Sequence, residues 1–188
     1  MTVAPAPHRF AVALLEPGPH PPGAALSLRD RSLEPRAGMK GLGAPAFLAA
    51  HGLVSDGVAN RATRQGAGGL VAMLSGTEAL ILGACATPFA DYGTGAPLAP
   101  GVYPVPRQGG TYWFSLAGDE APARLARLCG VDLRPHRHAD LAVAQTTIAR
   151  VSAVVIRDDA PSLRFHIVGD VTLAAYMAGV LVDALAKE

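Results

Sequence analysis

The sequence has few charged residues, and this limits the partners it can recognise. Charged residues make up 16% of the 188 residues, while hydrophobic residues make up 50%. With so few charges to solvate the surface, we expect some apolar surface to meet a partner. The net charge is +1, and no Lys/Arg cluster of the kind that binds phosphate is present. Both observations argue against nucleic acid as the main ligand.

Cysteines and long apolar runs are also scarce. Cys85 and Cys129 are the two cysteines, too few for a disulfide framework or, by themselves, for a four-ligand zinc site. They fit a reducing, cytoplasmic location. The apolar run at residues 12–15 is too short for a signal peptide or a membrane span, so we expect no targeting segment and no membrane insertion.

Proline separates an N-terminal segment, residues 1–36, from the rest of the chain. Seven prolines lie there, and a regular element around residues 17–22 is disfavoured because proline removes hydrogen-bond donors and fixes φ. The segment is predicted to be a disordered tail or an extended arm along a partner subunit, with a short strand possible at residues 24–28. Residues 37–188 form the second predicted region, with halves at about 37–105 and 106–188.

Hydrophobic patterns and capping residues predict the elements of the two halves. Helices are expected at residues 43–52, 120–130 and 171–186, the last of them capped by Asp170. Strands are expected at 69–75 and 79–83 (a hairpin), near Tyr103, at 111–116, at 142–157 and at 163–168. Residues 142–157 read either as one long strand or as two strands joined by a bulge near Arg150.

A short internal repeat indicates how these elements are arranged. Residues 44–49 (APAFLA) resemble residues 121–126 (APARLA), and each segment is followed, after a loop, by an apolar hairpin. This order suits a duplicated strand–helix–hairpin unit, the split βαβ arrangement of ferredoxin-like folds. The predicted class is therefore α+β, with two tandem ferredoxin-like halves built on antiparallel sheets.

No complete catalytic set is visible, and most candidate groups have a simpler structural interpretation. His136 and His138 supply too few ligands for a metal site and are expected in a solvated loop. Cys129 lies near basic residues that would lower a thiol pKa, but a buried small side chain is favoured. Asp158 and Asp159 are expected to form a turn rather than a carboxylate pair.

Two further motifs carry little chemistry by themselves. The glycines at residues 66–69 precede a strand rather than a helix, so they do not form a phosphate-binding loop. Residues 145–147 (QTT) are the polar part of an otherwise apolar strand and are expected to face water or a partner.

Residues 128–150 (LCGVDLRPHRHADLAVAQTTIAR) are the most distinctive stretch of the chain. Their Cys-Gly-Val-Asp-Leu segment, the following Pro135 and the Ala-Gln-Thr that opens a strand resemble the γ subunit of heterotetrameric sarcosine oxidase. The resemblance extends through residues 149–151, 165–167 and Tyr176, and upstream to residues 73–82 and 41–53. It covers the chain from about residue 40 to its end.

The resemblance implies a fold and a role. That family is similar to the folate-binding domain of glycine-cleavage T-proteins and related aminomethyltransferases. It implies a non-catalytic γ-type subunit of a complex that oxidises an N-methyl amino acid with a flavin and passes the one-carbon unit to tetrahydrofolate. Flavin, NAD and tetrahydrofolate would belong to the larger partner subunits. No catalytic aspartate of the T-proteins can be matched onto this sequence.

Two alternatives remain open: a stand-alone folate-binding aminomethyltransferase-like protein, and a scaffold that reuses the fold. We expect no catalytic or metal-binding residues, with Gln145 as a weak candidate for cofactor binding. The residues predicted to face a partner subunit are Arg134, His136, Gln145, Thr146 and Arg150. Changes at Gln145 or Arg150 are predicted to weaken subunit association more than folding.

Overall fold

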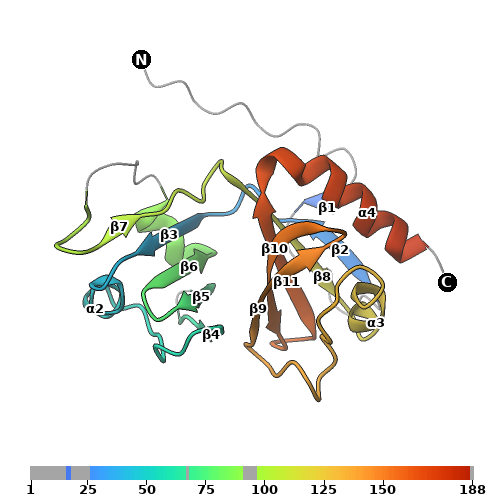
Figure 1. Cartoon of the computed structure of the whole chain (residues 1–188), viewed down its shortest axis with the longest axis horizontal. Helices are drawn as coiled ribbons and strands as arrows, with labels where there is room; N and C mark the ends of the chain where they lie inside the picture. Colours follow the sequence, from blue (N-terminus) through green and yellow to red (C-terminus); the bar gives the residue numbers. More distant parts are fainter. Residues whose placement is uncertain (1–15, 18–25, 67, 91–96, 187–188) are drawn as a thin grey trace.

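The computed structural model describes residues 16–17, 26–66, 68–90 and 97–186, whose strands fall into two sheets (Figure 1). One sheet has the order β4-β5-β6-β3-β7 and the other β1-β2-β8-β11-β10-β9. The strands are β1 (Glu16–Pro17), β2 (Ser27–Asp30), β3 (Arg36–Lys40), β4 (Arg61–Arg64), β5 (Leu70–Ser75), β6 (Glu78–Leu82), β7 (Tyr103–Pro104), β8 (Thr111–Ala117), β9 (Val143–Ile148), β10 (Val151–Asp158) and β11 (Arg164–Asp170). The helices are α2 (Ala44–Ala50), α3 (Ala121–Leu125) and α4 (Ala174–Ala186), with 3-10 turns η1 (Ala84–Phe89) and η2 (Val171–Leu173).

The predicted α+β class, with two tandem halves on antiparallel sheets, is confirmed by the strand pairing. Each half runs strand, helix and three-stranded meander: β3-α2-β4-β5-β6, then β8-α3-β9-β10-β11. In both, the last strand of the meander pairs antiparallel with the first strand of the unit. Two strands lie between those that the helix connects, which is a variation on the split βαβ unit.

Each unit is extended by a short strand from elsewhere in the chain. β7 pairs with β3 of the first half, while β2 pairs with β8 of the second half. β2 lies within the predicted N-terminal segment of residues 1–36, so this part of the segment is neither tail nor free arm. Residues 1–15 and 18–25 lie outside the described residues.

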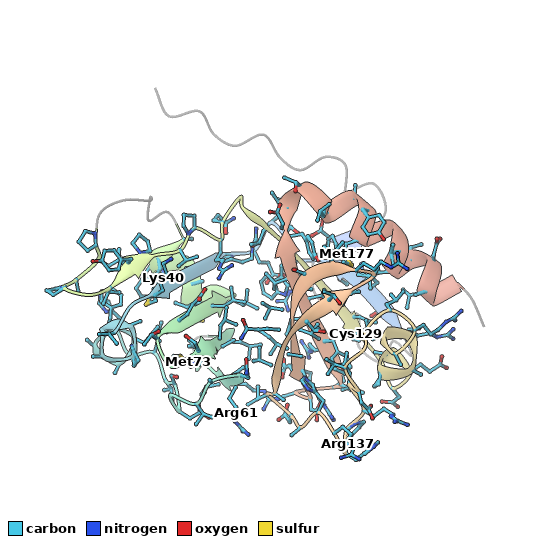
Figure 2. All side chains as sticks on the ribbon, viewed as in Figure 1. Lys40, Arg61, Met73, Cys129, Arg137 and Met177 are labelled. Carbon is cyan, nitrogen blue, oxygen red and sulfur yellow. The ribbon has the colours of Figure 1, made fainter. Side chains whose placement is uncertain are left out.

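Three apolar clusters divide the molecule into four layers, with a helix layer on each outer side of the two sheets (Figure 1). The first cluster lies between α2, η1 and the first sheet and includes Met73, and a second lies between the other sheet and α3 and α4 and includes Met177 (Figure 2). The third joins the facing sides of the two sheets through Leu80, Leu82 and Trp113. The two halves therefore share the third cluster as a common core between their sheets.

β8 shows why an apolar run becomes a central strand. All seven of its residues are buried because both faces of the sheet are covered. Tyr112, Phe114 and Leu116 point to the helices, while Trp113 points to the other sheet. The strand predicted at residues 111–116 is confirmed.

The first helix ends where its sequence predicts. Gly52 has φ +72° and follows α2, and its N–H donates to Ala49 while the N–H of Leu53 donates to Leu48. These two bonds form a Schellman cap, which favours glycine.

The second predicted helix is much shorter than residues 120–130. α3 ends at Leu125, after which the N–H groups of Leu128 and Cys129 both donate to the carbonyl of Leu125. Cys129 then bridges Ile148 of β9. Tertiary pairing with a strand therefore ends the helix before its sequence signal does.

Residues 142–157 are neither a single strand nor a bulged one. β9 and β10 pair antiparallel through a two-residue turn at Ala149 and Arg150, whose φ values are +49° and +67°. Two-residue turns of this kind favour Asn and Gly. Neither residue type stands at positions 149 and 150, so the sequence did not indicate the turn.

The last predicted helix is confirmed, although its first turn, η2, is a 3-10 turn. Asp170 caps this turn by accepting from the N–H of Thr172. In the predicted apolar stripe, Met177 and Leu181 are buried, but Leu173 and Tyr176 are exposed. Among the described residues, no helix is both long and apolar enough to cross a membrane.

Candidate functional site between the two sheets

A large cavity opens between the two sheets, beside the shared core. Its volume is about 810 Å³, and its walls come from both halves and from the connection at residues 106–111. On the second sheet, Gln145 pairs with Val154 and Thr147 with Ser152. These side chains lie on the face of the second sheet that packs against the first sheet. They occupy the part of this face that the first sheet leaves uncovered. One wall of the cleft is therefore polar.

Gln145 links the two halves across this cleft. Its Nε2 donates to Oδ1 of Asn60 at 2.8 Å and to the carbonyl oxygen of Leu74 at 2.7 Å. Both N–H bonds of the amide are thus used within the chain. Within the described residues nothing donates to the side-chain oxygen of Gln145, so this oxygen is the acceptor that Gln145 could offer to a ligand.

Arg107 is the charged group of the opposite wall. Its guanidinium lies over Gly38 of β3, where an added Cβ would come within 3.0 Å of Nε. Nη2 donates to Glu78 at 3.0 Å, whereas Nε is buried without a hydrogen-bond partner among the described residues. Burial lowers the pKa of Arg107, and Glu78 opposes this shift.

Sequence reasoning did not find Arg107, which lies in a loop rich in proline and glycine. The available signal was Gly38, a glycine inside a strand, which often marks a close approach by another group. The cleft can hold a polar ligand by hydrogen bonds. It offers Ser, Thr, Gln, Arg and Asp side chains, and Oδ1 of the aspartate, Asp170, accepts from Thr172. Among the described residues that line the cleft there is no histidine or cysteine that would form a nucleophile–base pair.

A second, smaller cavity of about 240 Å³ lies between the sheets around Asp158. Asp158, predicted to be a turn residue, accepts from Nε of Arg64 at 2.8 Å and lies 3.5 Å from Nε2 of His166. It also accepts the N–H of Ala160, so the turn prediction captured only part of its role. Asp159 pairs separately with Arg157.

The acidity of Asp158 follows from these neighbours. Burial raises the pKa of Asp158, but hydrogen bonds from His166 and Arg64 outweigh burial and hold it at about 2. Burial lowers the pKa of His166, whose Nδ1 accepts from Nε1 of Trp113 at 3.1 Å. These bonds fit a neutral imidazole with its proton on Nε2, facing Asp158.

The predicted partner-facing residues do not form one surface. Arg134 makes a bidentate ion pair with Asp132, at 2.8 and 2.7 Å, and His136 lies 3.9 Å from the same carboxylate. Both line a groove of about 720 Å³ beside α3. Thr146 lies on this side, with its hydroxyl 3.7 Å from the sulfur of Cys129 in the groove wall.

The other two candidates are placed differently. Arg150 is exposed in the β9–β10 turn, whereas Gln145 faces the inter-sheet cleft. Adjacent strand residues point to opposite faces, so the Thr146 hydroxyl is directed to Cys129 rather than to the partners of Gln145. Both residues nevertheless contribute atoms to the wall of the cleft.

The loop histidines differ from the prediction in one respect. His136 is exposed, but His138 is buried, and burial lowers its pKa. The loop is drawn inward because Nη1 of Arg157 donates to the His138 carbonyl at 2.6 Å. Cys129 is buried, as predicted. Across the described ranges, no three His, Cys, Asp or Glu side chains gather as a metal site would require.

Comparison with known proteins identifies solved structures that have a similar fold. No protein-family model matches the chain, and no curated protein matches its sequence. Among solved structures, a chain of the heterotetrameric sarcosine oxidase from Corynebacterium sp. U-96, in complex with pyrrole 2-carboxylate, matches with a TM-score of 0.71. The alignment covers 98% of this chain and 95% of that chain, at 18% identity.

This chain shares its fold with a chain of heterotetrameric sarcosine oxidase. A glycine cleavage system aminomethyltransferase T from Bartonella henselae also matches, with a TM-score of 0.56 and 17% identity. There the alignment covers 85% of this chain but 46% of the aminomethyltransferase, so this chain spans about half of that protein. The fold implied by the sequence resemblance is confirmed.

Proposed function

We propose that the chain is a non-catalytic γ-type subunit of a flavin-dependent enzyme complex related to sarcosine oxidase. The complex would oxidise an N-methyl amino acid and transfer the released one-carbon unit to tetrahydrofolate. The observation that carries the proposal is the chain-for-chain correspondence with one chain of a heterotetrameric enzyme, 98% of one against 95% of the other. A correspondence of this extent supports a role like that of the matching chain.

The chemistry of the described residues is consistent with a non-catalytic subunit. Neither inter-sheet cavity contains a cysteine or a metal cluster, and His166 is held between Trp113 and Asp158 in the core. As the resemblance implies, the larger subunits would hold flavin, NAD and tetrahydrofolate. The proposal keeps the cytoplasmic location predicted from the two cysteines, which are free and buried.

Four of the five predicted partner-facing residues, all except Gln145, lie near the outer edge of the second sheet. β9 is the end strand of that sheet. Its C-terminal end meets Leu128 and Cys129, and at its N-terminal end the N–H of Val143 donates to the carbonyl of Asn60. Arg134 and His136 lie beside this edge across the groove, and Arg150 lies at its turn. Exposed charges next to a strand edge that the chain covers only in part suit a polar subunit interface.

Co-expression with the flavin-binding subunits of the same genome, followed by native mass spectrometry, tests the proposal. We expect the chain to be recovered in a hetero-oligomer of fixed stoichiometry. Arg134→Ala and Arg150→Ala should weaken this assembly while the melting temperature of the isolated chain stays within about 2 °C. Arg61→Ala is the matched control because Arg61 is a similarly exposed arginine in the first half, and its one ion pair with a described residue is to Asp56. A chain that is always monomeric would refute the subunit role.

A stand-alone folate-binding protein is the second candidate. It is favoured by the cleft between the two halves, which Gln145 lines as that interpretation required. Calorimetric titration of the isolated chain with tetrahydrofolate decides, and Gln145→Ala is the variant to compare. Absence of both heat and thermal shift would remove this candidate and leave the subunit role intact.

A further inference from the structure

The cavity around Asp158 concentrates positive charge inside the protein. Three arginines line its 240 Å³: Arg31, Arg64 and Arg164. They come from both halves, since Arg64 ends β4, Arg31 follows β2 and Arg164 begins β11. The side chains of Arg31 and Arg164 are each only 17% exposed, so water screens them weakly.

The ion pairs of these arginines leave donors free. Arg31 pairs with Glu34, Arg64 pairs with Asp140 and Asp158, and Arg164 donates to the carbonyl of Ala160 at 2.8 Å. In the described part of the chain, every hydrogen bond of the three uses Nε or Nη2. One nitrogen, Nη1, therefore remains on each guanidinium for another acceptor.

Arg164 is the least neutralised of the three. Its nearest carboxylate, Asp158, lies at 3.7 Å and already accepts from Arg64. Burial lowers the pKa of Arg164, and the charges of Arg31 and Arg64 lower it further, although Asp158 opposes them. A guanidinium in this position favours an additional anion.

Part of the cavity wall is apolar, although Gln65, Asp158 and His166 also line the cavity. Trp113, Leu70 and Leu82 line it, and Arg31 stacks over the Trp113 ring with its guanidinium carbon 4.2 Å from the centroid. An inorganic anion would leave this wall without contacts, whereas the hydrocarbon part of a small organic acid would cover it.

We propose that this cavity binds a small organic carboxylate. The carboxylate accepts from Arg164 and Arg31, and a hydrocarbon part of a few carbon atoms lies against Trp113 and the two leucines. The volume limits the ligand to a small acid. The site is separate from the larger cleft and does not depend on the proposed subunit role.

The chain provides its own reporter, because Trp113 is its single tryptophan and lines the cavity. Tryptophan emission of the full chain is titrated with succinate, with butyrate and with inorganic phosphate. Ionic strength is held constant with sodium chloride so that screening does not imitate binding. We expect a saturable change with at least one of the two organic acids, at a Kd of about 1 mM or tighter. Saturation by phosphate alone would overturn the carboxylate assignment, and no saturation would overturn the site.

Two variants test the arginines. Arg164→Gln and Arg31→Gln should each raise the Kd of the organic acid by at least about tenfold. Calorimetry measures this Kd, because Arg31 itself influences the tryptophan emission. Arg107→Gln is the matched control, since Arg107 is also a partly buried arginine paired with one carboxylate but lines the other cleft. Circular dichroism establishes that each variant is folded. Equal affinity in the wild-type chain and a folded variant of either arginine would overturn the proposal, and the wild-type titration decides if neither variant folds.

Discussion

At the scale of single residues, buried charge is concentrated at the end of β10. Asp158, Arg64 and His166 join the two halves through contacts between 2.7 and 3.5 Å. Such groups are stable inside a protein only while each is paired, because an unpaired buried charge is costly. The stability of the chain should therefore depend on the ionisation of this one aspartate.

Asp158→Asn is expected to destabilise the chain at neutral pH. The folded-state pKa of Asp158 is about 2, below its ordinary value of 3.8. Because the pKa is lower in the folded state, the ionised carboxylate stabilises the fold at every pH above the pKa of the unfolded chain. This stabilisation is lost as the pH falls through the folded-state pKa. Urea unfolding should show a loss of about 2 kcal/mol at pH 7. The difference from the wild-type chain should shrink between pH 4 and pH 2. Asp56→Asn, at an exposed ion pair, should change little; a loss for Asp158→Asn that does not vary with pH would contradict the assignment.

Gly38 is a second residue whose role depends on its neighbours. An added Cβ would lie 2.8 Å from the carbonyl oxygen of Val105 and 3.0 Å from Nε of Arg107. Gly38→Ala should displace the connection that carries Arg107 and lower the free energy of unfolding by about 1–3 kcal/mol. Gly66→Ala is the control, since an added Cβ there meets no atom within 4 Å. Equal stability of the two variants in urea unfolding would show that the connection adapts without cost.

At the scale of elements, turns rather than helices decide the arrangement of the second half. The β9–β10 turn holds Ala149 and Arg150 at positive φ, supported by the hydroxyl of Tyr176, which donates to the Ala149 carbonyl at 3.2 Å. Positive φ is unfavourable for both residue types. The turn forms because the strands on either side pair over six residues each.

Replacing this turn with its preferred sequence should therefore stabilise the chain. The double variant Ala149→Asn/Arg150→Gly is expected to raise the free energy of unfolding by about 1 kcal/mol. Arg150→Ala alone is the comparison, because it removes the same side chain and leaves the backbone requirement in place. Thermal melting measures both. A double variant that melts below Arg150→Ala would indicate that the turn needs the native side chains.

At the scale of the whole molecule, the two halves share the core between their sheets. Leu80 of the first half and Trp113 of the second belong to the same buried cluster. Neither sheet can keep its apolar inner face covered without the other. We therefore expect the chain to unfold as one cooperative unit despite its repeated architecture.

Leu80→Ala tests this cooperativity. Leu80 is fully buried, so the variant should lose about 2–5 kcal/mol. The loss should be the same when unfolding is followed by Trp113 fluorescence and by far-UV circular dichroism. Leu42→Ala is the control because Leu42 is 89% exposed. A Trp113 transition that Leu80→Ala leaves unchanged would show that the halves unfold separately.

The sequence by itself determined most elements, the repeat and the fold class. These depend on local patterns, such as the aromatic run of β8, the glycine after α2 and the matched segments at residues 44–49 and 121–126. The similarity of residues 128–150 to a known family also led to the correct fold, because order and spacing persist where identity is as low as 18%.

Only the tertiary structure decided where α3 ends, how β9 turns into β10, and which charged residues meet. Arg64 and Asp158 are 94 residues apart in the chain, and Gly38 and Arg107 belong to different elements. Contacts of this kind depend on how two sheets pack, and no local pattern specifies them. The cavity with three arginines exists for the same reason: its walls are assembled from both halves when the shared core forms.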